Sequence, residues 1–293
     1  MRTNVDRRYI LDLNRRFHDD VEAAAYDQRM GVVHDVGAIG RTVAELEHVL
    51  GAPLPRGGRV VDVASGTGNI AVKLALTGWW DEVIAVEISI RSLDVAQRVA
   101  QSFGKNLTIV ESDMVTLPFA TGSVDFLVGC AFLHHLPDPV AFMKEVARVL
   151  KPGSAFVFIG EPTHFGMNAT NVIKFPLIFT NRVLRAMRAG NADMFHWDHE
   201  NIDVHDFSQS DARRLLNGFN EPRIVTQGFA EPIVDQGLLA PVRGVVGNSN
   251  WINKTLAALR RLMAAADTYV FNRLLPRGMK VSLKISGKKP LFA

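Results

Sequence analysis

A carboxylate followed closely by a glycine loop is the feature of this sequence most suited to binding a ligand. Asp62 interrupts the apolar tract of residues 60–63, and residues 64–68, reading ASGTG, follow it. Glycine has no Cβ atom, so Gly66 and Gly68 can take positive φ angles and let a ligand lie against backbone N–H groups. The pattern predicts a loop between a strand and a helix that presents bare backbone to a small molecule.

Two classes of ligand fit such a loop. Residues 66–71, reading GTGNIA, match the relaxed dinucleotide pattern, and Glu87 lies about 20 residues further on, where a ribose-binding acid is expected. A nicotinamide or flavin cofactor is therefore one candidate. However, Asp62 would repel a pyrophosphate and attract an ammonium group, which favours S-adenosylmethionine. The structural alternative is that Asp62 caps the following turn or helix.

Several further segments, in order over residues 59–161, resemble class I S-adenosylmethionine-dependent methyltransferases of the methyltransferase type 11 kind. The stretch DVASGTG at 62–68 is similar to their motif I, usually D-x-G-x-G-x-G. The other matching segments are VEIS at 86–89, ESDM at 111–114, LPF at 117–119, SVDF at 123–126, LHHLPDP at 133–139 and VLKPG at 149–153. Ala64 replaces the first glycine of motif I, and Ser154 replaces the second glycine of the usual K-P-G-G turn. The methyl group of Ala64 is tolerated there if its φ angle is negative.

The resemblance implies a role at the cofactor for each matching residue. The backbone of residues 64–68 would cradle the methionine and ribose portions, with Asp62 near the ammonium group. Glu87 would accept hydrogen bonds from the ribose hydroxyls. Ile88 would lie against the adenine, and Asp113 would accept from its amino group beside the Met114 backbone. Cys130 would neighbour the sulfonium, packing as a small apolar group. The predicted cofactor-binding residues are Asp62, Ala64, Ser65, Gly66, Gly68, Glu87, Ile88, Asp113, Met114 and Cys130.

Histidines are the candidates for a general base, which methyl transfer needs only when the acceptor must lose a proton. His164 follows the fifth predicted strand at the carboxyl edge of the sheet, where ligands bind in open α/β folds, and is the first candidate. His135 is the second, and it lies beside His134 in the motif that follows the fourth strand. His196, His199 and His205 have spacings that are poor evidence for a metal, so no metal site is predicted. We interpret these three as polar residues that line or latch a lid.

The elements that position these residues form a doubly wound α/β fold. Continuous apolar strands alternate with helical patterns, as is typical of a parallel sheet covered by helices on both faces. We expect a Rossmann-like, seven-stranded mixed sheet whose last strand, residues 280–286, is antiparallel. The predicted strands are residues 59–63, 82–86, 107–111, 124–130, 155–160, 223–228 and 280–286. The predicted helices of this core are residues 69–77, 89–103, 140–150 and 210–217.

A run of glycines and prolines at residues 51–58 divides the chain into a helical N-terminal cap, residues 1–57, and a core, residues 58–293. Insertions at about 163–207 and 233–277 are expected to form a substrate roof together with the cap. The first insertion holds aromatic residues that either cover an apolar acceptor or pack as its own core: Phe165, Phe175, Phe179, Phe195 and Trp197. The second has one apolar helix face: Leu256, Leu259, Leu262, Met263, Ala266 and Val270. Tyr26 is expected near the cofactor.

The composition is that of one decorated globular domain, with 293 residues of which 47% are hydrophobic and 22% charged. Cys130 is the only cysteine, which excludes an intramolecular disulfide and indicates a reducing, cytoplasmic setting. No export signal or membrane-spanning tract is predicted. Residues 254–293 carry nine Lys or Arg and one acid, Asp267. This basic region is either a solvated surface or a contact for phosphate groups.

The sequence as a whole predicts methyl transfer from S-adenosylmethionine to a small, largely apolar acceptor, at the oxygen of a molecule like a secondary metabolite. One alternative is a membrane-surface enzyme that acts on a lipid or quinone and uses the basic C-terminal region for peripheral contact. Another is a partner protein that binds S-adenosylmethionine without catalysis. No nucleic-acid partner is expected, since the chain has neither an Asn-Pro-Pro-Tyr type motif nor an RNA-binding module. No oligomeric state is predicted.

Overall fold

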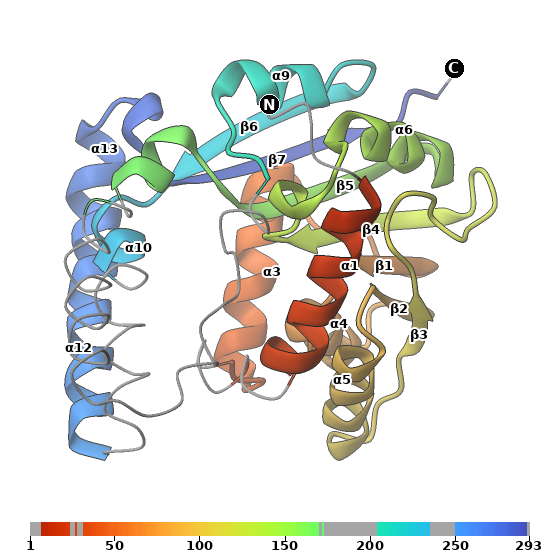
Figure 1. Ribbon diagram of the computed structural model, residues 1–293, viewed down its shortest axis with the longest axis horizontal. Helices are drawn as coiled ribbons and strands as arrows, with labels where there is room; N and C mark the ends of the chain where they lie inside the picture. Colours follow the sequence, from red (N-terminus) through yellow and green to blue (C-terminus); the bar gives the residue numbers. More distant parts are fainter. Residues whose placement is uncertain are drawn as a thin grey trace.

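A single seven-stranded sheet organises the chain (Figure 1). The computed structural model describes residues 7–23, 27, 32–169, 172, 204–234 and 250–291. The strands are β1 Arg59–Val63, β2 Glu82–Glu87, β3 Thr108–Glu111, β4 Val124–Cys130, β5 Leu150–Pro162, β6 Asn220–Gln227 and β7 Ser282–Lys288. Their order across the sheet is β3-β2-β1-β4-β5-β7-β6, and β7 runs antiparallel to both of its neighbours. The predicted Rossmann-like mixed sheet is confirmed.

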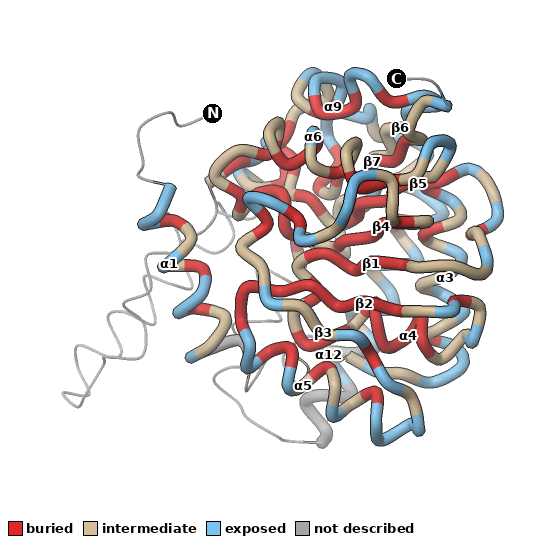
Figure 2. The backbone as a smooth tube through the Cα atoms, turned by 90° about the vertical axis from the view of Figure 1, so that its right-hand side faces the viewer, coloured by how far each residue is buried: buried red, intermediate tan, exposed pale blue. Residues whose placement is uncertain are grey.

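The inner strands are continuous apolar runs because helices cover both of their faces, as Figure 2 shows by their burial. Successive side chains of β4 point to opposite faces, so Phe126 and Val128 join one core cluster and Leu127 joins the other. The helices α3 Val36–Leu50, α4 Asn69–Thr77 and α5 Ile90–Ser102 cover the first face. The helices α6 Pro139–Val149 and α9 Gln209–Leu215 cover the second.

Helix α3, in the predicted N-terminal cap, packs directly on the sheet. Leu46 and Val49 are fully buried in the same cluster as the side chains of α4 and β1. From β7, Lys284 Nζ donates to Glu45 Oε1 at 2.6 Å, and Ser286 Oγ donates to the carbonyl of Val49 at 2.9 Å. The apolar periodicity of α3 therefore reflects packing on the sheet. Among the described residues of the predicted cap, α1 Arg7–Phe17 and the π-helical turn η1 His18–Glu22 contact the loops at the carboxyl edge.

The second insertion forms a helical unit beside the sheet, at the left of Figure 1. It contains α10 Ala230–Val234, α12 Asn250–Ala266, the π-helical turn η5 Asp267–Phe271, α13 Asn272–Leu274 and the turn η6 Arg277–Met279. The buried carboxylate of Asp267 accepts from the backbone N–H groups of Phe229, Ala230 and Glu231 at 2.8–3.1 Å. This acid therefore caps α10 and fixes it against η5.

The apolar face predicted for α12 is only partly correct. Leu262 is 62% exposed and Val270 is 43% exposed, so neither belongs to the packed face. The π-helical turn at residues 267–271 adds residues per turn and shifts Val270 out of the register that a continuous α-helix would give. Among the described residues, no helix is both long and apolar enough to cross a bilayer.

Candidate functional site

The loop between β1 and α4 is built as the glycine pattern predicts. Gly66 and Gly68 have φ angles of 53° and 85°. A Cβ atom on Gly68 would lie 2.7 Å from the Cβ of Ala96 in α5, so only glycine allows this packing. At Gly66 an added Cβ would meet no heavy atom within 4 Å, which leaves space on that side of the loop. The Ser65 Oγ atom is buried and has no hydrogen-bond partner in the described part of the chain. The loop therefore offers one open backbone position and one unsatisfied hydroxyl.

Asp62 is 2% exposed and caps α4 from the preceding strand. Its Oδ2 atom accepts a hydrogen bond from the backbone N–H of Ala71, the third residue of α4, at 2.9 Å. Burial raises the pKa of Asp62 to about 8, and the backbone hydrogen bond from Ala71 opposes this rise while the nearby charge of Glu87 adds to it. The capping alternative is thus present in the structure. The predicted contact with a ligand ammonium remains a prediction, and it requires Asp62 to lose its proton.

Glu87 joins the glycine loop to the end of β2. Its Oε2 atom accepts from the backbone N–H of Gly66 at 3.0 Å, and its Oε1 atom accepts from Ile88 at 2.9 Å and Ser89 at 3.3 Å. Because β1 and β2 are parallel and paired, with Val63 opposite Val86, both strands deliver an acid to the same edge. Asp62 and Glu87 therefore lie beside the same glycine loop, and their roles at the ammonium and the ribose stay predictions.

Ile88, Asp113 and Met114 lie at the same edge. Glu87 of β2 pairs with Glu111 of β3, so the segments after both strands emerge side by side. Ile88 is buried, and Asp113 is half-buried with its Oδ1 atom accepting from the backbone N–H of Val115 at 3.0 Å. The roles of Ile88 and Asp113 at the adenine stay predictions.

The φ angle of Ala64 is positive, contrary to the condition on which its methyl group would be tolerated without strain. Ala64 has φ of 50°, in the left-handed region that favours glycine. Met114 and Ala131 also have positive φ angles, at 64° and 53°. Ala64, Met114 and Ala131 follow β1, β3 and β4, respectively, at the carboxyl edge. Strained backbone of this kind gathers at functional sites, which supports the location of the site.

Cys130 ends β4 and is a packed thiol. Burial raises the pKa of Cys130 to about 12, and the nearby acids add to this rise. A thiol with such a pKa is not ionised near neutral pH, so it is a poor nucleophile. This agrees with the prediction that Cys130 packs as a small apolar group.

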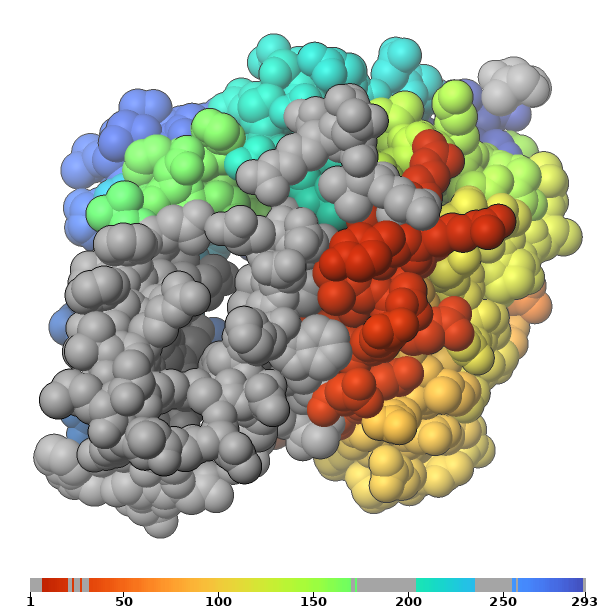
Figure 3. All heavy atoms as spheres, viewed as in Figure 1, coloured from red at the N-terminus to blue at the C-terminus, as the bar shows by residue number. Residues whose placement is uncertain are grey.

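The N-terminal segment lies across the strand ends that carry these residues, as the red atoms of Figure 3 show. Asn14 Nδ2 donates to the carbonyl of His135 at 3.2 Å, after β4. Ser89 Oγ, after β2, donates to Asp19 Oδ1 at 2.6 Å. Thr67 of the glycine loop hydrogen-bonds to Asp27. The cover is therefore tied to three loops of the carboxyl edge. Tyr26 lies outside the described residues.

Glu161 is a buried acid next to the site that the sequence analysis did not identify. It is fully buried at the end of β5, and its carboxylate accepts from the backbone N–H groups of Phe132, Leu133 and His134 at 2.9–3.2 Å. The same carboxylate lies 2.9 Å from Nδ1 of His134. Glu161 therefore fixes the turn η2 Leu133–His135, which follows β4. A signal existed: Glu161 lies at the end of an apolar strand, as Asp62, Glu87 and Glu111 do.

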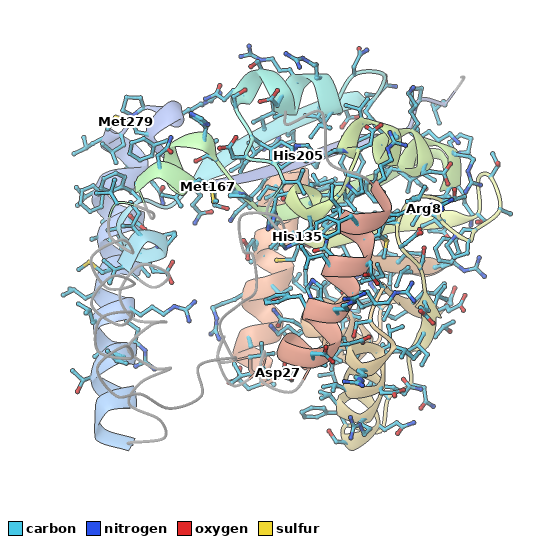
Figure 4. The ribbon with its side chains drawn as sticks, in the orientation of Figure 1. Arg8, Asp27, His135, Met167, His205 and Met279 are labelled. Atoms are coloured by element: carbon cyan, nitrogen blue, oxygen red, sulfur yellow. The ribbon has the colours of Figure 1, made fainter. Side chains whose placement is uncertain are left out.

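His135 lies under the N-terminal cover, as Figure 4 shows. Its ring centroid is 3.9 Å from that of His134 and 6.0 Å, edge to face, from that of His18 in η1. His135 is therefore enclosed between the turn after β4 and the cover.

His164 lies in a different part of the same edge. It is bonded through Nδ1 to Asp206 at 2.9 Å, and its side chain is 70% exposed. It lines a pocket of about 410 Å³ between the segment after β5, the start of α9, β6 and the turn η6. Of the predicted site residues that the structure describes, His164 lines this pocket and the cofactor-binding residues do not. The two candidate bases are thus not brought together.

The aromatic side chain of Phe165 packs inside the helical unit. Its ring lies 6.1 Å from that of Phe229, stacked, and Phe229 lies 5.2 Å from Phe271. Phe165 also lines the pocket beside His164, so both interpretations of this residue stay open. Phe175, Phe179, Phe195 and Trp197 lie outside the described residues.

The histidines considered as metal ligands fall mostly on residues that are not described, namely His196 and His199. His205 is buried beside the carbonyl groups of Leu136 and Pro137, and its burial lowers the pKa of its imidazole. Within the described ranges, no three His, Cys, Asp or Glu side chains form a group that could hold a metal ion.

Comparisons with known proteins identify a methyltransferase domain in the part of the chain that carries this site. Residues 61–158 match the family described as "Methyltransferase domain". An uncharacterised chloroplastic methyltransferase from Arabidopsis thaliana is 35% identical over 106 residues, which cover 34% of this chain and 30% of the relative. Demethylmenaquinone methyltransferase from Bacillus licheniformis is 28% identical over 128 residues, which cover 43% of this chain and 55% of the relative. The similarity therefore spans about a third to a half of the length of these relatives.

The similarity in fold to solved structures covers more of the chain than the residues matched by sequence. Phosphoethanolamine N-methyltransferase 2 from Haemonchus contortus, solved with phosphomonomethylethanolamine and S-adenosylhomocysteine, superposes with a TM-score of 0.62. The superposition covers 98% of this chain and 61% of that chain at 17% identity, so it shows the shared fold alone. The chain thus combines a stretch that matches a methyltransferase domain, residues 61–158, with the Rossmann-like fold of solved methyltransferases.

Proposed function

We propose that this protein is a cytoplasmic enzyme that transfers a methyl group from S-adenosylmethionine to an oxygen atom of a small, largely apolar acceptor. The observation that carries the proposal is the pairing of two buried carboxylates, Asp62 and Glu87, around the open backbone of Gly66. The charge of Glu87, joined by that of Asp62 once it ionises, disfavours a pyrophosphate and favours a ligand with cationic groups. The unsatisfied Ser65 hydroxyl gives the same ligand a hydrogen-bonding partner.

Each site residue binds one part of the cofactor in this proposal. Asp62 pairs with the ammonium group, and Glu87 accepts from the ribose hydroxyls with the lone pairs that its backbone contacts leave free. Ile88 packs on the adenine, and Asp113 accepts from the adenine amino group. Cofactor binding by these residues is supported by their common position at the carboxyl edge.

Bound S-adenosylmethionine supplies an electrophilic methyl group on a sulfonium whose positive charge is lost as the methyl group leaves. The chain's contribution is to align the two reactants and to exclude water. The cover formed by α1 and η1 is suited to the second task because it is tied to the ends of β1, β2 and β4. Glu161 holds the turn after β4, and His135 with it, in one position.

The pocket that His164 lines is the acceptor site in this proposal. Phe165, Val172, Phe207 and Leu283 give it apolar walls, and Thr226 and Arg277 are among its polar residues. Asp206 at Nδ1 of His164 favours the tautomer in which Nε2 is free to accept a proton. A hydroxyl group on the acceptor loses its proton to Nε2 as its oxygen bonds to the methyl carbon.

Methyl transfer is tested with S-adenosylmethionine labelled in its methyl group. The wild-type protein is incubated with extract fractions, and label is followed into organic-soluble products. A His164→Gln variant is expected to lose roughly 10²-fold in rate while it binds S-adenosylhomocysteine as the wild type does. An Asp62→Asn variant keeps an acceptor for the backbone N–H of Ala71. It is expected to lose both methyl transfer and the binding of S-adenosylhomocysteine. Cofactor binding by the wild type without any label transfer would instead support the non-catalytic alternative.

A lipid or quinone is the second candidate acceptor. The similarity to demethylmenaquinone methyltransferase and the apolar walls of the pocket both favour it. Comparison of label transfer to a demethylated quinone and to a phenol of similar size distinguishes the two candidates. Label on a ring carbon of the quinone would contradict the proposed O-methylation.

A further inference from the structure

The outer face of the helical unit at residues 260–279 combines arginines with exposed apolar side chains. Arg261, Ala265, Tyr269 and Arg273 follow one another at spacings of four residues, and all are exposed. Leu262 and Leu274 lie next to this row and are 62% and 76% exposed, and Tyr269 is 68% exposed. Side chains of this size are mostly buried in a water-soluble domain. We call this surface, formed by Arg261, Leu262, Tyr269, Arg273, Leu274, Arg277 and Met279, the arginine face.

The charge of the arginine face is not neutralised within the described residues. Arg261, Arg273 and Arg277 make no ion pair with a described acid, whereas Arg260 pairs with Glu231 at 2.6 Å. The basic residues further along the chain are also engaged: Lys284 with Glu45, and Lys288 with Glu221. The single acid of this region, Asp267, is buried and is occupied by three backbone N–H groups. The unpaired positive charge therefore coincides with the exposed apolar side chains.

Two further features relate this face to the rest of the molecule. It lies on the side of α12 and α13, across the molecule from α5 and β3 (Figure 1), and Figure 4 shows Met279 on the same side. Arg277 and Gly278 also line the apolar pocket of about 410 Å³. The face is thus continuous with the wall of the pocket that we assign to the acceptor.

We propose that the arginine face docks this protein on the surface of an anionic lipid bilayer. The arginines contact lipid phosphates, and the apolar side chains with Tyr269 enter the region between headgroups and acyl chains. The docking is peripheral and weakens as salt screens the charge. It presents the pocket wall at Arg277 to the bilayer, from which an apolar acceptor enters. Docking does not depend on the proposed reaction, so the two fail separately.

Binding to vesicles tests the docking. The full chain is sedimented with vesicles of phosphatidylcholine alone and of phosphatidylcholine mixed with phosphatidylglycerol, at low and high salt. Each basic side chain at an anionic surface strengthens binding roughly fivefold, so Arg261→Glu with Arg273→Glu is expected to weaken it by at least about 30-fold. Arg261→Lys with Arg273→Lys keeps the charge and is expected to keep most of the binding. Arg98→Glu, an exposed change on α5, is the matched control and leaves the binding unchanged.

A separate variant, Tyr269→Ser with Leu274→Ser, tests the apolar contribution to vesicle binding. It is expected to weaken binding at high salt more than at low salt. Thermal melting confirms that each variant is folded. Equal binding of the wild type to neutral and anionic vesicles, or unchanged binding of the charge-reversed variant, would overturn the proposal. So would self-association of the wild type that the charge-reversed variant abolishes, because the face would then join two copies of this chain. Capture of RNA without capture of vesicles would overturn it as well.

Discussion

The Oδ2 atom of Asp62 lies 2.9 Å from the backbone nitrogen of Ala71, so the acid that ends the first inner strand holds the start of the helix after the glycine loop. The same acid is 2% exposed and lies near the charge of Glu87. Its ionisation is therefore unfavourable until a cation arrives. Asp62 therefore both caps the helix after the glycine loop and supplies a negative charge that a cationic ligand can stabilise.

This burial predicts how stability depends on pH. The pKa of Asp62 is raised from 3.8 to about 8 in the folded chain. Its contribution to stability is fully present below the unfolded pKa and is lost as the pH rises through about 8. Between about pH 4 and pH 8 the free energy of unfolding should fall more in the wild type than in Asp62→Asn, which has no charge to bury. Denaturant unfolding at several pH values measures this. Parallel pH profiles for the two proteins would contradict the assignment.

The same ionisation predicts pH-dependent binding of S-adenosylhomocysteine. If the ligand ammonium pairs with ionised Asp62, binding releases a proton below pH about 8, and affinity rises toward that pH. Isothermal titration in two buffers of different protonation enthalpy measures the proton released. Asp62→Asn should bind S-adenosylhomocysteine more weakly and release fewer protons on binding. Equal proton release by wild type and variant would show that another group titrates.

Ala64 is expected to be a strained residue. Its φ angle of 50° favours glycine, so Ala64→Gly should raise the free energy of unfolding by roughly 1 kcal/mol. The control is Ala75→Gly within α4, where the added backbone freedom should lower stability by about 1 kcal/mol or more. Thermal or denaturant unfolding measures both. A loss of stability in Ala64→Gly would show that the methyl group makes contacts that outweigh the strain.

Glu161 is expected to be required for the turn after β4. In Glu161→Ala three buried backbone N–H groups lose their acceptor, at a cost of about 1–3 kcal/mol for each group left unsatisfied. Glu161→Gln keeps one oxygen acceptor, so its free energy of unfolding should fall less than that of Glu161→Ala. Asp94→Asn, on the exposed side of α5, should stay within about 0.5 kcal/mol of the wild type. An ordering in which the Gln variant is the less stable would contradict this account.

The N-terminal cover is expected to control how fast the cofactor leaves. Asp19→Ala removes the acceptor for Ser89 Oγ and should speed the dissociation of S-adenosylhomocysteine about fivefold, with little change in the melting temperature. Asp12→Ala removes an exposed pair with Arg16 inside the same helix and should leave dissociation unchanged. Stopped-flow displacement measures both rates. Equal rates in the wild type and Asp19→Ala would show that the contact does not hold the cover.

Local sequence patterns predicted most of the sheet. The bounds of β1, β4 and α4 agree with the structure to the residue, because apolar runs and flanking glycines mark them. β5 begins at Leu150, five residues before the predicted start, since the Lys151-Pro152-Gly153 segment is included in it. The role of Glu161 depends on contacts with residues 27–29 positions away, and no local pattern reveals such contacts. The positive φ angle of Ala64 is likewise set by the geometry of the loop, which the sequence does not reveal. The π-helical turn after α12 also leaves no recognisable pattern in the sequence.

The central claim is that the acids Asp62 and Glu87 around the Gly66 loop select a cationic nucleoside over a dinucleotide. Isothermal titration of the full chain with S-adenosylhomocysteine and with NADH tests it most directly. The claim predicts saturable binding of S-adenosylhomocysteine, weakened in Glu87→Gln, and no binding of NADH. Tight binding of NADH without binding of S-adenosylhomocysteine would contradict it.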